Sequence, residues 1–193
     1  MKIIKKKLIV IRHIIVTLIC LIITIQNGIC QDIDSNVKWY RSKEDMRWVY
    51  GKIQLGASKD QIWNVLSNVE KWAEIFQDIK TIKVHKKHDN ILETEVDAIS
   101  MTHKTYWNIK LSPPNKASFK DEGHGIIMEM IFFIEEEPIN NTCMVNLHIS
   151  IESDGFIGWF IPDSELRKRQ EKMVVQYLND IKKELHTGDK SHH

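Results

Sequence analysis

The feature that most constrains the fold is a run of six segments, between residues 79 and 152, in which apolar and polar residues alternate. A period of two is typical of strands, because successive side chains point to opposite faces of a sheet. The connections between the segments are short and rich in turn-forming residues, so the strands are predicted to pair as an antiparallel meander. The expected strands are 79–86, 91–100, 103–111, 117–122, 126–136 and 143–152.

One long amphipathic helix is expected after these strands, because apolar residues recur at heptad-like spacing over 164–186. Before them, residues 48–55 alternate as a further strand, and Ser58 with Gln61 forms a capping box that predicts a helix start. A second short helical segment is expected at 72–76. A twisted sheet of seven strands needs a cover for its concave face. At 1.5 Å per residue the last helix would span roughly 34 Å, which is long enough.

The order of these elements resembles the helix-grip superfamily, also called START-like or SRPBCC proteins. The resemblance rests on the segment GASKDQIWNVLSNVEKWAEIF after the first strand, and on the long helix at the end. The superfamily includes START-type lipid-transfer domains, polyketide cyclases, coenzyme Q-binding proteins and the birch-pollen allergen group. The resemblance covers about residues 46–186. It implies an α+β fold in which a seven-stranded curved antiparallel sheet, two short helices and a long C-terminal helix enclose a cavity for a hydrophobic molecule.

The first 30 residues have the pattern of a secretory signal peptide. An apolar run over 14–25 follows a basic start, and Gly28 and Cys30 place small residues where a signal peptidase reads, so cleavage is expected after Cys30. The apolar run is shorter than the roughly 20 residues that span a bilayer. The chain is therefore predicted to be exported, either secreted or extracytoplasmic. Anchoring by an uncleaved N-terminal helix is the alternative.

The rest of the chain is predicted to hold a single domain, over 46–186, with a polar lead-in at 31–45 and a polar tail at 187–193. The first 30 residues hold five of the 27 basic residues and none of the 26 acidic ones, which leaves a formal charge of −4 after cleavage. This balance argues against nucleic acid as a partner, because there is no basic excess to neutralise phosphates. Only Cys143 remains after cleavage, so no internal disulfide is expected. Asn140 begins a glycosylation sequon, a short motif that often arises by chance.

The inward faces of the strands and the apolar stripe of the long helix supply the candidate ligand-binding residues. A pair of methionines suits an adaptable apolar pocket. The same side chains would also serve as an ordinary filled core. On the strand at 126–136 both faces are apolar, so Ile127, Ile131 and Phe133 compete for the inward positions. The candidates are Val96, Trp107, Ile109, Met128, Met130, Phe132, Val145, Leu147, Phe156, Trp159, Met173 and Tyr177.

The segment GFIGWFIP, at 155–162, joins the last expected strand to the long helix. In a helix-grip fold this connection lies near the rim of the cavity. On one hypothesis its aromatic side chains fold inward and plug the end of the core. On the other they form a lid or insert into a membrane, and the basic cluster that follows attracts anionic lipid at about 1 kcal/mol per residue near the surface. The residues of the membrane hypothesis are Phe156, Trp159, Phe160, Arg167, Lys168 and Arg169.

No motif assigns a metal, a cofactor or a catalytic residue. The histidines form no His-Glu-x-x-His pair, and phosphate loops, dinucleotide fingerprints and serine-hydrolase elbows are absent from the sequence. His148 is expected to be solvated on an outer strand face. The alternating acids Glu93, Glu95 and Asp97 are expected to face solvent in the same way.

Three functions are compatible with these patterns. The predicted one is non-catalytic binding or transport of a lipid or isoprenoid in the cavity. The alternative is an enzyme of polyketide cyclase or dehydratase type, in which His103, Tyr106 or an inward-facing carboxylate transfers protons. A collapsed domain that binds no ligand and works through its surface is the third.

Overall fold

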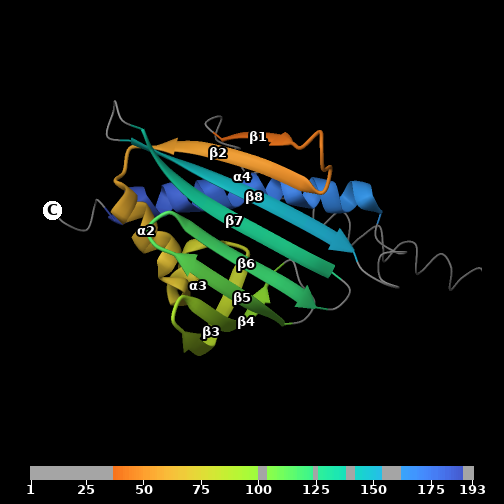
Figure 1. Cartoon of the computed structure of the whole chain (residues 1–193), viewed down its shortest axis with the longest axis horizontal. Helices are drawn as coiled ribbons and strands as arrows, with labels where there is room; N and C mark the ends of the chain where they lie inside the picture. The colour runs from red at the N-terminus through yellow and green to blue at the C-terminus, as the bar shows by residue number, and fades with distance from the viewer. Residues whose placement is uncertain (1–36, 100–103, 124–125, 138–141, 154–161, 189–193) are drawn as a thin grey trace, which may run out of the picture. The chain divides into compact units, whose positions relative to one another are not determined.

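The computed structural model describes residues 37–99, 104–123, 126–137, 142–153 and 162–188, which form one curved antiparallel sheet and its helices (Figure 1). The sheet has eight strands in the order β1-β2-β8-β7-β6-β5-β4-β3, so the first long strand pairs with the last. The last strand of the predicted meander, β8, therefore joins the meander to the N-terminal strands β2 and β1. The strands are β1 (Lys38–Arg41), β2 (Trp48–Leu55), β3 (Ile79–His88), β4 (Ile91–Ala98), β5 (Thr105–Ser112), β6 (Lys116–Gly123), β7 (Ile126–Glu137) and β8 (Thr142–Ser153).

The edge strand β1 is the element that the sequence did not predict, and the count of seven strands is one short. Its four residues, KWYR, lie inside the segment expected to be a polar lead-in and carry no alternation that would distinguish a strand. The strand exists because it pairs with β2, from Lys38 opposite Lys52 to Arg41 opposite Val49. The Arg41 side chain adds a tie to the long helix.

The short helices follow β2 as predicted. In α2 (Lys59–Ser67) the backbone N–H of Gln61 donates to Ser58 Oγ at 3.3 Å, and the backbone N–H of Ser58 donates to Gln61 Oε1 at 2.8 Å. The predicted capping box is thus confirmed. A 3₁₀ turn, η1 (Val69–Lys71), and the four-residue α3 (Trp72–Ile75) complete the connection to β3.

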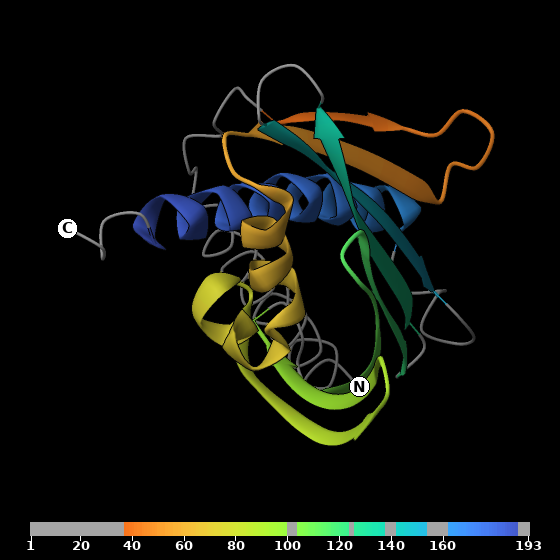
Figure 2. The same cartoon turned by 60° about the vertical axis from the view of Figure 1, so that its left-hand side comes forward.

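The long helix α4 (Asp163–Gly188) lies against one face of the sheet and packs mainly on β8 and β2, as Figure 2 shows. Its predicted apolar stripe is buried at Leu166, Met173, Val174, Tyr177, Leu178 and Ile181. The residue of β2 beneath the helix is Gly51, where a Cβ would overlap Val174 Cγ1 and lie 3.1 Å from Leu178 Cδ1. Glycine at this position allows the helix to approach the sheet backbone closely.

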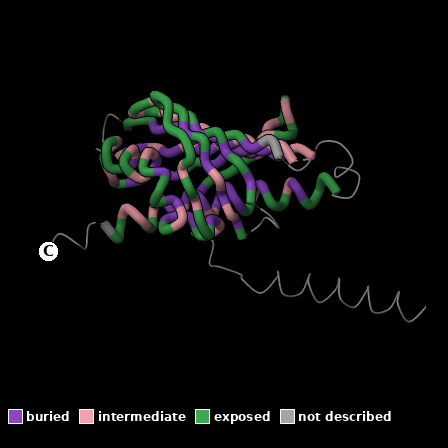
Figure 3. Tube along the Cα trace, turned by 90° about the horizontal axis from the view of Figure 1, so that it is seen from below, coloured by how far each residue is buried: buried purple, intermediate pink, exposed green. Residues whose placement is uncertain are grey.

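The strands have one buried and one more exposed face, and Figure 3 shows buried residues alternating with exposed ones along the chain. The ambiguous strand β7 turns Met128, Met130, Phe132 and Ile134 inward, while Ile127, Ile131 and Phe133 are half-buried on the other face. The core lies between the inner face, α4 and the short helices. Phe76 illustrates this, because it packs against Trp72 of α3, Phe132 of β7 and Tyr177 of α4.

Within the described residues, none of the helices has the length and apolar character needed to cross a membrane. The predicted signal peptide, the GFIGWFIP segment except Pro162, and Asn140 lie outside the described residues.

Candidate functional site

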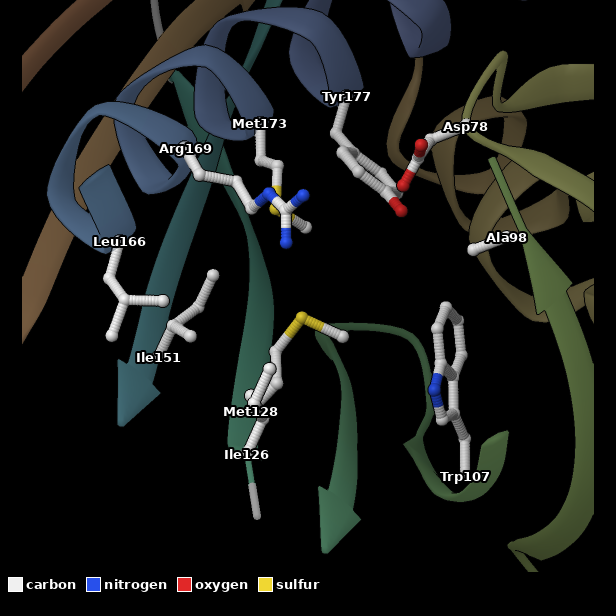
Figure 4. Close-up of a pocket in the computed structure, with 10 residues that line it drawn as sticks. All are labelled: Asp78, Ala98, Trp107, Ile126, Met128, Ile151, Leu166, Arg169, Met173 and Tyr177. Carbon is white, nitrogen blue, oxygen red and sulfur yellow. The ribbon is translucent and has the colours of Figure 1, made fainter. Parts of the chain in front are cut away.

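A narrow pocket lies beneath the first turns of α4, between the helix and the inner face of the sheet (Figure 4). Its cavity volume is about 10 Å³, space for about one water molecule. The described side chains therefore nearly fill this pocket, and ligand entry would require them to move. The described residues that line the pocket are Asp78, Ala98, Trp107, Ile126, Met128, Ile151, Leu166, Arg169, Met173 and Tyr177.

Four of the candidate ligand-binding residues meet at this pocket: Trp107, Met128, Met173 and Tyr177. The others that the structure describes are fully buried in the surrounding core and do not line the pocket: Val96, Ile109, Met130, Phe132, Val145 and Leu147. Phe156 and Trp159 lie outside the described residues. Ligand contact by all of these residues stays a prediction.

The lining also includes residues that the sequence did not single out for ligand contact. Asp78 precedes β3 at the end of the short-helix connection, and a polar residue in such a turn gives no sign that it faces a pocket. Arg169 was assigned to a basic surface cluster, but it contributes to the pocket wall from the second turn of α4. Arg169 lies one helical turn before Met173, on the same side of α4. This spacing could have predicted from the sequence that Arg169 faces the pocket.

Two buried polar atoms lie at the pocket without a hydrogen-bond partner among the described residues: the hydroxyl of Tyr177 and Nε1 of Trp107. Tyr177 is 1 % exposed, and burial raises the pKa of its phenol well above the usual value, with the charges of Asp78 and Asp180 acting in the same direction. The phenol is therefore neutral and able to donate. Trp107 is stacked on Phe119, with ring centroids 4.7 Å apart and an interplanar angle of 11°, which holds the indole in place.

A buried acid lies close behind Tyr177. Asp180 is 4 % exposed, and its Oδ2 accepts the backbone N–H of Gln77 at 3.1 Å. Burial raises the pKa of Asp180 from 3.8 to about 6, because removing the carboxylate from water disfavours its charged form. The hydrogen bond from Gln77 and the charge of Lys183 act against this rise.

A second buried acid, Asp121, lies on the inner face of β6. It is 2 % exposed and stands in register between Trp107 of β5 and Met128 of β7, both of which line the pocket. The alternation Ala117, Phe119, Asp121 was enough to place it on the inner face. Sequence reasoning did not name it, because an acid near a strand end is ordinarily solvated.

The other groups considered for proton transfer lie elsewhere or are not described. Tyr106, a possible proton-transfer group in the enzyme alternative, is 65 % exposed on the outer face of β5. Successive side chains of a strand face opposite sides of the sheet, and the neighbouring Trp107 faces inward. His103 and His124 lie outside the described residues. In the described part of the chain, no group of three or more His, Cys, Asp or Glu side chains is arranged to hold a metal ion.

The prediction that His148 is solvated is also wrong. It lies on the outer face, as its parity implied, but it is half-buried between the rings of Tyr50 at 4.5 Å and Phe133 at 4.9 Å. Burial lowers the pKa of this imidazole. Two aromatic neighbours on adjacent strands cover it, and sequence alternation alone does not reveal such cross-strand contacts.

The alternating acids of β4 face outward as expected and form surface ion pairs. Asp97 lies 3.6 Å from Lys80, Glu93 lies 3.0 Å from Lys86, and Glu95 bonds Lys104 and His85. Lys104 is the main cause that lowers the pKa of Glu95. These acids stabilise an outer surface and do not form a catalytic set.

The curved antiparallel sheet, the two short helices between β2 and β3, and the long C-terminal helix together define the helix-grip fold of START-like proteins. Solved structures with this fold include a START superfamily protein from Mycobacterium smegmatis, with 11 % identity over 72 % of this chain and 97 % of that one at a TM-score of 0.60. The ZhuI aromatase/cyclase from Streptomyces sp. R1128 matches with 17 % identity over 72 % and 93 % of the two chains, at 0.60. Human StAR-related lipid transfer protein 5 matches with 8 % identity over 79 % and 82 %, at 0.61.

At these identities the likeness concerns the fold alone. No family model matches the chain, and no curated protein matches its sequence.

Proposed function

We propose that this protein binds and carries a hydrophobic small molecule, of lipid or isoprenoid type, between α4 and the inner face of the sheet. The observation that carries the proposal is the pocket beneath the start of α4, whose wall is apolar except for Asp78, Arg169 and the polar atoms of Trp107 and Tyr177. Proteins of the same fold are named as a lipid transfer protein and as an aromatase/cyclase.

The nearly filled pocket is compatible with this function, because two of the side chains that fill it are flexible methionines. Met128 and Met173 face each other across the pocket (Figure 4). Methionine is unbranched and repacks with little cost, so a ligand can displace it more easily than it can displace a β-branched side chain. A ligand that buries about 300 Å² of apolar surface would gain on the order of 7 kcal/mol before ordering costs.

The test combines ligand identification with a variant that blocks the pocket. Mass spectrometry of organic extracts from gently purified protein should reveal a bound apolar molecule, and a fluorescent fatty acid should bind with a saturable signal. Ala98→Phe places a ring in the pocket and should weaken this binding at least tenfold. Ile99→Phe is the matched control, because Ile99 is 62 % exposed and does not line the pocket. An empty extract together with no uptake of the fatty acid would refute the proposal.

The alternative, a cyclase or dehydratase that uses the same pocket, is favoured by one observation, the carboxyl group of Asp121 on the inner face. A buried carboxyl group has the chemistry of a general acid or base. If it is catalytic, Asp121→Asn will abolish turnover of a linear poly-β-ketone thioester and leave its binding intact. If the wild-type protein leaves this compound unchanged, the enzyme hypothesis loses its support.

Export and membrane contact form a further part of the proposal. The predicted signal peptide would deliver the protein out of the cytoplasm, and the aromatic segment before α4 together with Arg167, Lys168 and Arg169 would contact anionic lipid. Lys168 is paired with Glu165 at 3.2 Å on the exposed surface, which reduces the net positive charge there. Trp159→Ala separates the two hypotheses for this segment: a membrane tip loses liposome association, whereas a plug loses thermal stability.

A further inference from the structure

Two buried polar atoms lie at a pocket whose other lining residues are apolar except for Asp78 and Arg169. Nε1 of Trp107 and the hydroxyl of Tyr177 are both cut off from solvent and have no hydrogen-bond partner among the described residues. Each such group costs about 1–3 kcal/mol relative to a paired one, and buried polar groups in folded proteins are nearly always paired. Two of them at one pocket point to a partner that the described residues do not supply.

The chemistry of the two groups defines that partner. An indole N–H is a donor only, so it requires an acceptor, and a neutral phenol can donate to the same kind of atom. Figure 4 shows the indole nitrogen of Trp107 on the side facing Met128, across the pocket from Tyr177. The two side chains come from β5 and α4, so a molecule held between sheet and helix would lie between them.

We infer that the pocket recognises a ligand with an oxygen acceptor, a hydroxyl, carbonyl or ether group, at its buried end, held by Trp107 Nε1–H and the Tyr177 hydroxyl. This inference rests on the proposed function and narrows it, because a pure hydrocarbon would leave both groups unpaired. The apolar wall provides affinity for the body of the ligand, and the two donors select its end group.

A matched pair of probes tests the inference. In 2-methoxynaphthalene and 2-ethylnaphthalene the ring and the shape are nearly the same, and only the ether oxygen differs. The purified wild-type protein should bind the methoxy compound at least threefold more tightly, although the ethyl compound is the more hydrophobic. The side-chain N–H signal of Trp107, assigned with Trp107→Phe, should lie further downfield in the nitrogen–proton NMR spectrum with the methoxy compound than with the ethyl compound.

Tyr177→Phe removes one hydroxyl and keeps the ring, so it should abolish most of the preference for oxygen and leave affinity for 2-ethylnaphthalene unchanged. Thr105→Val is the matched control. Thr105 Oγ1 is also buried without a described partner on the inner face of β5, but Thr105 does not line the pocket. This variant should retain the preference of the wild type.

Each other result overturns the inference in a recognisable way. Equal or tighter binding of 2-ethylnaphthalene by the wild type would refute recognition of oxygen and leave the carrier function standing. An equal Trp107 shift with both probes would show that Nε1–H does not donate to the ether oxygen, and would refute this inference. Binding of the fluorescent fatty acid without either naphthalene would place the ligand elsewhere. Failure of all three compounds to bind would refute the proposed function itself.

Discussion

At the scale of single residues, Gly51 is required for the contact between sheet and helix. A Cβ at this position would overlap Cγ1 of Val174, and the short Val174 side chain is held in the core. We expect Gly51→Ala to lower the free energy of unfolding by about 1–3 kcal/mol, as overpacking usually does. Urea denaturation measures the change.

The matched control is Gly56→Ala, because a Cβ at Gly56 meets nothing within 4 Å. This variant should change stability by less than about 0.5 kcal/mol. Val174→Ala removes the atom that the new Cβ meets. The double variant should therefore lose less stability than the sum of the losses in the two single variants. A Gly51→Ala protein as stable as the wild type would show that α4 moves away from β2 without penalty.

Asp180 gives the protein a dependence of stability on pH. Its pKa in the folded state is about 6, against a usual value of 3.8, so between about pH 4 and pH 6 the folded state binds more protons than the unfolded state. Stability conferred by this group is therefore highest at low pH and falls as pH rises through that window. At pH 7.5 the ionised, buried carboxylate costs up to about 3 kcal/mol.

We expect Asp180→Asn to remove this cost, because the amide oxygen can still accept the N–H of Gln77 and carries no charge. The variant should unfold at a higher temperature than the wild type at pH 7.5, and the difference should shrink towards zero near pH 4. Differential scanning calorimetry across this range measures it. The idea fails if the variant is the less stable protein at pH 7.5.

At the scale of elements, the Arg41 side chain links β1 to α4. Arg41 bonds Glu171 Oε1 at 3.1 Å, Gln170 Oε1 at 3.3 Å and the carbonyl of Arg167 at 3.4 Å. Its side chain is 17 % exposed, so the ion pair is better protected from solvent than ordinary surface pairs. The other support of this four-residue edge strand is its pairing with β2 and the stacking of Tyr40 on Tyr50, with ring centroids 5.2 Å apart.

We expect Arg41→Ala to loosen β1, so that backbone amides of this strand exchange with deuterium about tenfold faster while those of β8 are unchanged. Lys38→Ala is the control, because Lys38 is exposed at the other end of the same strand. Equal exchange in Arg41→Ala and the wild type would mean that pairing with β2 alone holds β1 in place.

At the scale of the whole molecule, we predict export directed by the first 30 residues. If cleavage follows Cys30, the exported protein will begin at Gln31, and intact-mass measurement of protein from culture medium or the extracytoplasmic fraction will show this directly. An intact N-terminus in the membrane fraction would establish the anchored alternative.

The fold could be predicted from the sequence because its main signals are local. Periods of two and near 3.6, turn residues and the Ser58–Gln61 capping box each depend on neighbouring residues only. They were sufficient for seven strands, the helices and the inner faces of most strands, including Cys143 and Val145 on β8. The strand β1 was missed because its stability comes from partners distant in the sequence.

What only the tertiary structure decided is which side chains meet. Gly51 beneath Val174, His148 between Tyr50 and Phe133, and Trp107 across from Tyr177 are contacts between elements distant in the sequence. The sequence by itself determined that Trp107 and Tyr177 face the interior, because side-chain direction follows local periodicity. It could not show that their polar atoms stay unpaired, because hydrogen bonding inside a core depends on the approach of distant strands and helices.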